Sequence, residues 1–182
     1  YEMPEAIEIN RIDSEMLDNV FYALLCDNPD LFFVGRKCVL RAENKKTWFS
    51  VDYTVDKAEY DAMKKELDET CAEITASFSN PEDIWQTELE IHDYVVDNCN
   101  YVLDDDLIGS TAYGVLVNGS GACEGYSKAA KLLMDSAGIE SAVISGEAES
   151  RKGEKQPHMW NVVRLDGSWY HLDCTWDDPV DE

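Results

Sequence analysis

A glycine-rich turn that leads a cysteine into a helix constrains this chain more than any other stretch. The turn spans residues 119–125 and places three glycines around Cys123. The apolar residues that follow recur at helical spacing: Tyr126, Ala129, Ala130, Leu133 and Ala137. Gly138 then stands where a helix commonly ends. Unpaired N–H groups and the helix dipole favour a thiolate at a helix start, so Cys123 is a candidate nucleophile.

The charge of the chain restricts its partners. Its 182 residues include 38 acidic and 15 basic side chains, for a net charge of −23. A surface this acidic excludes nucleic acid and anionic membrane as partners. The apolar residues, 45% of the chain, suffice for a core, but none of their runs approaches the roughly 20 residues of a membrane span. We therefore expect no membrane insertion.

The cysteine spacing indicates neither a metal site nor a disulfide framework. The six cysteines are Cys26, Cys38, Cys71, Cys99, Cys123 and Cys174. They contain no C-x-x-C pair and no zinc spacing, and a free Cys123 would leave an odd number to pair. The sequence gives no reason to expect a metal or a cofactor.

Residues 1–80 are predicted to form a helix–hairpin–helix extension. Helical spacing of apolar residues covers 14–26 and 57–78, and alternating segments at 38–43 and 47–55 flank a polar turn. Ser79-Asn80-Pro81 then breaks the second helix. This extension precedes a compact core at 81–182.

The core is predicted to begin with helices and to end with strands, which defines an α+β class. The expected helices lie at 82–97, at 110–117 and after Cys123, and the expected strands at 139–146, 158–165 and 168–175. Residues 148–157 are expected to form an exposed loop. Asp104-Asp105-Asp106 is interpreted as a solvated loop, with a calcium site as the alternative, although adjacent carboxylates lack the spacing of a known calcium loop.

The chain has three histidines that could serve as the base for Cys123. His92 lies on the apolar face of a predicted helix and is interpreted as a packed side chain. His158 begins a predicted strand directly after a polar loop, where an imidazole can face a cleft. His171 lies in the middle of a strand and is interpreted as packed or supporting. His158 is therefore the predicted base, with His171 as the alternative.

The hairpin register identifies a carboxylate that can orient His158. Asp166-Gly167 is a strong signal for a two-residue turn, which pairs Leu165 with Ser168. Side chains alternate along each strand, so His158 and Asp173 share a face as diagonal neighbours, about 7–8 Å apart at Cα. A base and a carboxylate orienter are what a cysteine nucleophile requires.

An oxyanion hole completes the predicted site. The backbone N–H of Cys123 is the expected first donor. The candidates for the second donor and for substrate binding are Tyr113, Asn118 and Trp160. Gly125, which as a helical glycine costs about 1 kcal/mol relative to alanine, is expected to let the hairpin approach closely.

Three ordered blocks resemble the transglutaminase-like superfamily, in particular its microbial, protease-like members. They are Gly-x-Cys-x-Gly-Tyr-Ser-x-Ala at 121–129, His-Met-Trp-Asn at 158–161, and the run from Trp169 to Asp178. The resemblance covers roughly 85–178. It implies a papain-like core in which a helix bearing the cysteine packs on an antiparallel sheet. The Cys-His-Asp triad that it implies falls on Cys123, His158 and Asp173.

Two departures from the family pattern stand out. The family often has proline where this chain has Cys174, whose side chain is expected to point away from the site. Family members continue with further strands after the Thr-Trp-Asp-Asp segment. We therefore expect either a small sheet or a core that continues beyond Glu182.

The expected function is a thiol enzyme acting on peptide or side-chain amide bonds through a thioester. Water as the acceptor makes a cysteine peptidase or amidase, which we favour; an amine makes a protein-glutamine transglutaminase. A non-catalytic binding module on the same fold is the third hypothesis. The expected partner is a protein or peptide substrate, the oligomeric state stays open, and the expected location is extracellular or at a bacterial cell surface, with the cytoplasm as the alternative.

Overall fold

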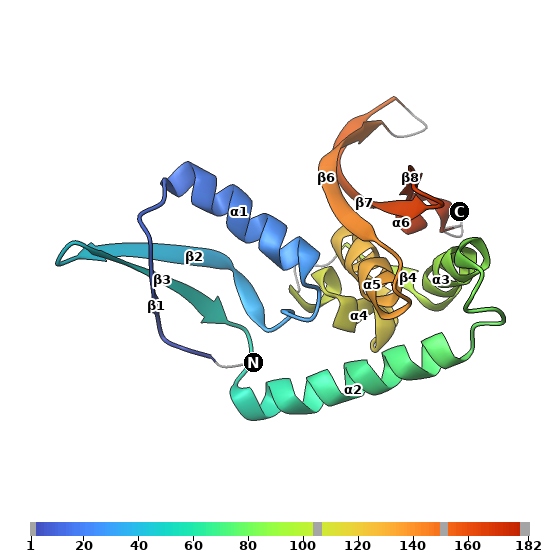
Figure 1. Cartoon of the computed structure of the whole chain (residues 1–182), viewed down its shortest axis with the longest axis horizontal. Coiled ribbons are helices and arrows are strands. Elements are labelled where there is room, and N and C mark those ends of the chain that lie inside the picture. The colour runs from blue at the N-terminus through green and yellow to red at the C-terminus, as the bar shows by residue number, and fades with distance from the viewer. Residues whose placement is uncertain (1–2, 104–106, 150–152, 179–182) are drawn as a thin grey trace.

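In the computed structural model of the chain, one long helix, α2 (Lys57–Ala76), runs below two regions of helices and strands (Figure 1). The structure describes residues 3–103, 107–149 and 153–178. Its two larger sheets are antiparallel and lie against helices. The predicted α+β class is therefore confirmed.

The N-terminal region is a three-stranded sheet with a helix beside it. Its elements are β1 (Ile7–Ile9), α1 (Ser14–Asp27), β2 (Val34–Glu43) and β3 (Lys46–Tyr53). The sheet order is β1-β3-β2, and all pairs are antiparallel. Asn44 and Lys45 adopt positive φ angles and form the two-residue turn between β2 and β3. The predicted helix and hairpin are confirmed, whereas β1 was not predicted.

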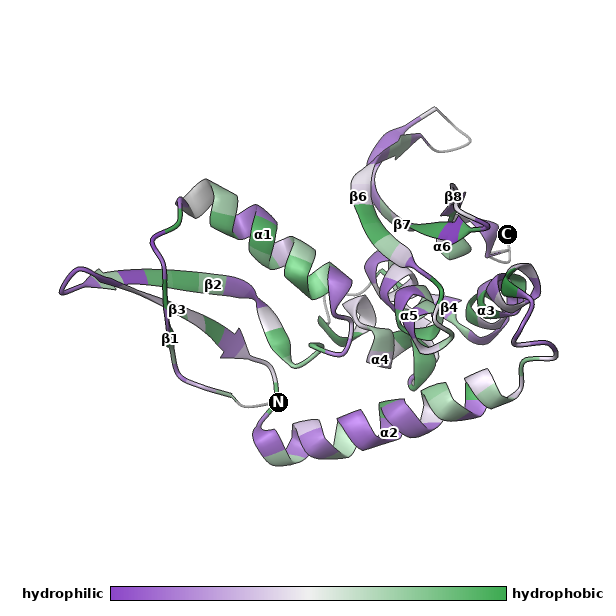
Figure 2. Cartoon of the chain, in the orientation of Figure 1, coloured by the Kyte–Doolittle hydropathy of each residue, from purple (hydrophilic) through white to green (hydrophobic). Residues whose placement is uncertain are grey.

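Helix α2 links the two regions. Asp56 caps its start by accepting hydrogen bonds from the backbone N–H groups of Ala58 and Glu59. Its buried residues are Tyr60, Leu67, Cys71 and Ile74. The first turns of α2 are largely hydrophilic (Figure 2). Among the described residues, no helix combines the length and the hydropathy needed to cross a bilayer.

One hydrophobic cluster joins the two regions. Phe32, Phe33 and Tyr60 from the N-terminal part pack in the same cluster as the buried residues of the C-terminal part. The ring centroids of Phe32 and Tyr113 lie 5.6 Å apart, which brings the segment between α1 and β2 against the centre of the molecule. The N-terminal region therefore contributes directly to the packing behind the site.

Short elements separate α2 from the helix that carries Cys123. They are α3 (Ile84–Asn98), β4 (Asn100–Tyr101), the 3-10 helix η1 (Leu107–Ser110), α4 (Ala112–Leu116) and β5 (Ser120–Gly121). Strands β4 and β5 pair in parallel and deliver the chain to α5 (Cys123–Ser136). The predicted loop at 104–106, with its alternative calcium site, lies outside the described residues.

The C-terminal sheet packs on α5. Its strands are β6 (Ser141–Glu149), β7 (Lys155–Leu165) and β8 (Ser168–Leu172), in that order and antiparallel. Leu165 pairs with Ser168, so the predicted register is confirmed. Two boundaries were wrong: residues 148–149 and 155–157 are strand rather than loop, and β8 stops before Asp173, where α6 (Cys174–Asp177) begins.

Candidate active site

The start of α5 packs closely against η1, and this close packing positions Cys123. The backbone N–H of Ala122 donates to the carbonyl of Gly109 at 3.0 Å. A Cβ at Gly121 would come within 2.6 Å of that same carbonyl oxygen, and a Cβ at Gly125 would clash with it too. Gly125 thus admits the backbone of η1, not the hairpin as predicted. Only glycine at these positions lets the turn pass so close to η1.

A buried imidazole on β7, the central strand of the C-terminal sheet, pairs with a partly exposed carboxylate just after β8. His158, 4% exposed, places its Nε2 at 2.8 Å from Oδ2 of Asp173. The other carboxylate oxygen, Oδ1, accepts the backbone N–H of Trp176 at 3.2 Å and so caps α6. Asp173 therefore both holds the ring of His158 and starts the short helix that follows it.

The thiol of Cys123 lies beside this pair. The backbone N–H groups of Met159, the residue after His158, and of Glu124 lie close enough to its sulfur to lower the pKa of the thiol. Burial raises the pKa of Cys123 nevertheless, and the two N–H donors oppose this shift. The helix start alone therefore does not make the thiolate, contrary to expectation, and the thiol requires a proton acceptor.

Aromatic side chains enclose the imidazole. Trp176 stacks on His158 with ring centroids 4.6 Å apart, and Trp160 stacks at 5.9 Å. The indole N–H of Trp160 donates to Nδ1 of His171 at 2.9 Å. His171 is exposed rather than packed, and this hydrogen bond is its contact with Trp160. Trp169, the first residue of the last motif block, is half exposed.

The predicted second oxyanion donors have other partners or positions. The hydroxyl of Tyr113 donates to Glu66 on α2 at 2.5 Å, so it points away from the site. Asn118 is exposed just after α4, and the indole N–H of Trp160 is taken by His171. The assignment of Tyr113 is wrong because α2 supplies an acceptor that lies 47 residues away in the sequence.

Sequence reasoning missed Tyr101 at the end of β4. Burial, and secondarily the charge of Cys123, raises the pKa of its hydroxyl, which therefore stays a proton donor at neutral pH. Its ring lies 6.1 Å from that of Tyr126. A tyrosine placed by a two-residue strand leaves no periodic signal in the sequence.

Helix α6 is anchored from two sides. The hydroxyl of Tyr126, on α5, donates to Asp178 at 2.7 Å. His92, on α3, places Nε2 at 3.3 Å from Asp177 and Nδ1 at 2.9 Å from Asp93. His92 therefore fixes the helix that Asp173 caps, a role beyond the packing expected of it.

The described residues contain no group of three or more His, Cys, Asp and Glu side chains arranged around a metal. All six cysteines are free. The chemistry that the described side chains can perform is nucleophilic attack by a thiol, assisted by an imidazole and a carboxylate.

Comparison with known proteins identifies the fold. Residues 68–174 match the family model of the transglutaminase-like superfamily. A crystal structure of a TGase is similar at a TM-score of 0.53 and 17% identity, covering 97% of this chain and 52% of that one. A candidate cysteine protease from Cytophaga hutchinsonii is similar at 0.51 and 12%, covering 76% and 61%.

The chain thus spans between about half and three fifths of the length of these two proteins. No curated protein is significantly similar in sequence. The family model matches more than half of the chain, and the antiparallel sheet packed on α5 agrees with the fold of both solved structures. The chain belongs to the transglutaminase-like superfamily.

Proposed function

We propose that this protein is a thiol enzyme that cleaves amide bonds of a protein or peptide substrate, with Cys123 as nucleophile, His158 as base and Asp173 as orienter. One observation carries the proposal. A buried imidazole is held by a carboxylate at 2.8 Å, and the N–H of the next residue contacts the sulfur of Cys123. A packed histidine without a catalytic role has no need of both neighbours.

The proton path follows from the hydrogen bonds. Asp173 occupies Nε2 of His158, so Nδ1 is the nitrogen that accepts the thiol proton. The thiolate attacks the substrate carbonyl, and the imidazolium then protonates the leaving amine. Asp173 holds the ring in one orientation and stabilises its cation through both transfers. The product is a thioester on Cys123.

The oxyanion that forms during attack requires two donors. The backbone N–H of Cys123 is one, because Cys123 is the first residue of α5 and its N–H has no acceptor within the helix. We assign the hydroxyl of Tyr101 as the second donor in place of Tyr113. The interaction of Tyr101 with the charge of Cys123 supports this assignment.

Hydrolysis of the thioester is favoured over transfer to an amine. A transferase has to keep water from the thioester. Here the carboxylate side chain of Asp173 is 25% exposed and Trp176 is 39% exposed, so solvent reaches both neighbours of the buried imidazole on the α6 side. This openness supports a cysteine peptidase or amidase, and transglutaminase activity remains the alternative.

The test incubates the protein with a casein-like substrate and a labelled amine. Peptide fragments without label in the substrate support the hydrolase, whereas label without fragments rejects it in favour of the transferase. Cys123→Ala removes either activity, and Cys38→Ala, which changes a half-buried thiol on β2, retains it. If the wild-type protein gives neither product, the result supports the hypothesis that it is a non-catalytic binding module.

A further inference from the structure

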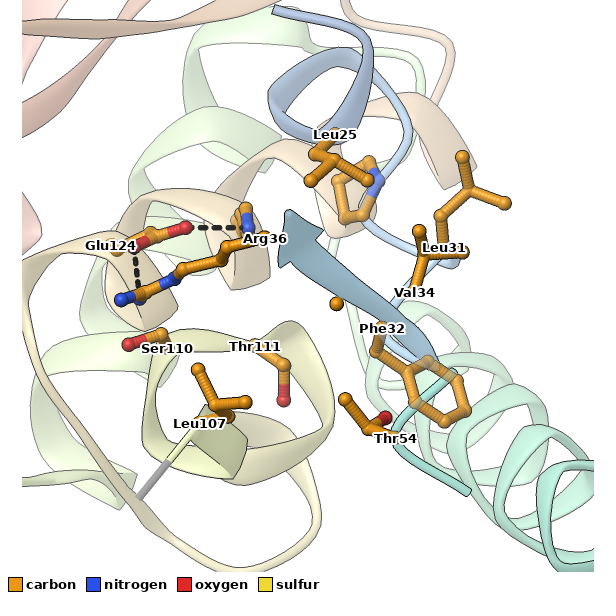
Figure 3. A pocket seen from close by; sticks show the side chains of 13 residues that line it. Leu25, Leu31, Phe32, Val34, Arg36, Thr54, Leu107, Ser110, Thr111 and Glu124 are labelled. Carbon is orange, nitrogen blue, oxygen red and sulfur yellow. Dashed lines mark hydrogen bonds and ion pairs between the residues drawn. The ribbon is translucent and has the colours of Figure 1, made fainter. Parts of the chain in front are cut away.

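The residue directly after the nucleophile lies in a buried charge cluster. Glu124 is 8% exposed, and its two carboxylate oxygens bind different cations. Nη2 of Arg36 lies 2.5 Å from Oε2, and Nζ of Lys128 lies 2.7 Å from Oε1 (Figure 3). Lys128 belongs to the next turn of α5, but Arg36 comes from β2, 88 residues earlier in the chain.

This contact is the polar link between the N-terminal region and the start of α5. Arg36 extends from β2 beside a small cavity of about 30 Å³, which has room for one water molecule. Apolar side chains of the N-terminal region, Leu25, Leu31, Phe32 and Val34, line the cavity together with Glu124 and Lys128 (Figure 3). The guanidinium side chain is 47% exposed, whereas Glu124 and Lys128 are almost wholly covered.

The cluster places two cations around one carboxylate next to the thiol. The carboxylate of Glu124 disfavours the thiolate of Cys123. Arg36 and Lys128 compensate that charge and leave the cluster with a net positive charge. From α1, Tyr22 and Cys26 also face Glu124, and neither carries a positive charge.

The remaining charged and titratable groups around Cys123 belong to the site itself. Asp173 from the end of β8 and Tyr101 from β4 act on the thiol electrostatically, and His158 lies beside it through Met159. Among all these groups, only Arg36 is supplied by the N-terminal sheet. Arg36 therefore pairs with Glu124, beside the nucleophile, only when that sheet is docked on α5.

We propose that Arg36 is a positioning residue of the active site, through which the N-terminal region holds Glu124 and keeps the first turn of α5 favourable to the Cys123 thiolate. The proposal rests on the proposed function, because it concerns the nucleophile of that reaction. It makes residues 1–80 part of the catalytic apparatus. An extension that could be removed without effect would not supply the positive charge of Arg36 to the residue beside the nucleophile.

The test measures the rate of Cys123 alkylation by iodoacetamide as a function of pH, followed by mass spectrometry of the Cys123 peptide. Arg36→Ala leaves Lys128 as the only cation on Glu124. The alkylation midpoint then rises by at least about half a pH unit. Arg36→Lys keeps the positive charge and restores most of the shift.

Arg41→Ala is the matched control. Arg41 lies on the same strand, and its side chain is exposed and pairs with the exposed Glu43 at 3.6 Å. This variant keeps the wild-type midpoint. Thermal unfolding of all variants shows whether Arg36→Ala has merely loosened the fold, a change that would not be rescued by the charge of lysine.

A second pair of variants separates charge from packing. Glu124→Gln removes the negative charge between two cations and lowers the midpoint. Arg36→Ala combined with Glu124→Gln restores the net charge of the cluster and brings the midpoint back toward wild type. A packing role predicts instead that the double variant is the more impaired.

The inference and the proposed function fail in different ways. If wild-type Cys123 reacts no faster than an ordinary thiol, the proposed function fails. If wild type is reactive and Arg36→Ala has the same midpoint as wild type and Arg41→Ala, the role of Arg36 is overturned while the triad stands.

Discussion

Asp173 makes the contacts that position both His158 and Trp176. One oxygen holds Nε2 of His158 at 2.8 Å, and the other accepts the N–H of Trp176. Trp176 in turn stacks on the same imidazole. A single carboxylate thus orients the ring directly and also places an aromatic wall against it, which prevents the imidazole from rotating.

Asp173→Asn is expected to lower kcat by about a thousandfold or more, because the amide favours the wrong ring tautomer while the shape of the side chain is retained. Peptide hydrolysis under saturating substrate measures this loss. Asp177→Asn, in the same short helix, removes a contact to His92 only and is expected to stay within a few-fold of wild type. Equal losses in both variants would mean that Asp173 acts only through α6.

Tyr101 tests the oxyanion assignment. Tyr101→Phe removes one hydroxyl donor and is expected to reduce kcat by about a hundredfold, with little change in stability. Tyr170→Phe, which removes an exposed hydroxyl on β8, serves as the control. A Tyr101→Phe enzyme with wild-type kcat would assign the second donor elsewhere.

At the scale of elements, α5 packs closely against both η1 and β7. The carbonyl of Gly109 accepts from Ala122 and leaves no room for a side chain at Gly125. On the other face, the buried side chain of Asn161, on β7, donates to the carbonyl of Ser127 at 2.9 Å. These contacts hold the helix that carries Cys123 against the strand that carries His158.

Gly125→Ala is expected to destabilise the protein even though alanine is the better helix former. The new Cβ meets a backbone carbonyl, which cannot move aside cheaply, and the overpacking costs about 1–3 kcal/mol against a propensity gain of about 1 kcal/mol. Urea unfolding measures the loss, and Cys123 alkylation reports the displaced helix start. Ser136→Ala, at the exposed end of α5, should change neither the urea midpoint nor the alkylation of Cys123. A Gly125→Ala variant with the wild-type urea midpoint would contradict the close packing of α5 against η1.

Local pattern predicted much of this geometry. Helical spacing identified α1, α2, α3 and α5, and the Asp166-Gly167 turn gave the register that brings His158 near Asp173. The end of β8 was missed because Asp173-Cys174-Thr175-Trp176 also alternates as a strand would. Only the cap that Asp173 places on Trp176 shows that the chain turns into α6.

Contacts between distant segments could not be predicted. The partner of Tyr113 is Glu66, and the partner of Glu124 is Arg36. In both pairs the spacing carries no periodic signal, and each pair forms only because the N-terminal region and α2 dock on the centre of the molecule. Because a single sequence does not reveal such contacts, the roles of Tyr113 and Glu124 could not be determined from it.

At the scale of the whole molecule, one core holds both regions together and buries several thiols. Burial raises the pKa of Cys71 and of Cys99 to about 11, and that of Cys174 also lies above its usual range. Cys71 lies on α2, Cys99 directly follows α3, and Cys174 is the first residue of α6. These three neutral thiols therefore all belong to the shared hydrophobic core.

Stability is expected to fall as the pH rises above about 9. Unfolded thiols lose their protons near that pH, whereas the folded Cys71 and Cys99 hold theirs to about 11. The unfolded state therefore gains up to about 1.4 kcal/mol per pH unit for each such group. Urea midpoints at about pH 8 and about pH 10 measure the loss, and Cys71→Ala should show a smaller pH dependence than wild type. An equal pH dependence would assign the loss to other groups.

The central claim is that His158 activates Cys123, and the alkylation rate of Cys123 by iodoacetamide at about pH 6 tests it most directly. Burial raises the pKa of Cys123 above its ordinary value of 9.0, so the thiol alone is unreactive at that pH. Wild type should react faster than an ordinary exposed thiol, and His158→Ala should react only as the pH rises past that value. Equal rates in wild type and His158→Ala at about pH 6 would contradict the account.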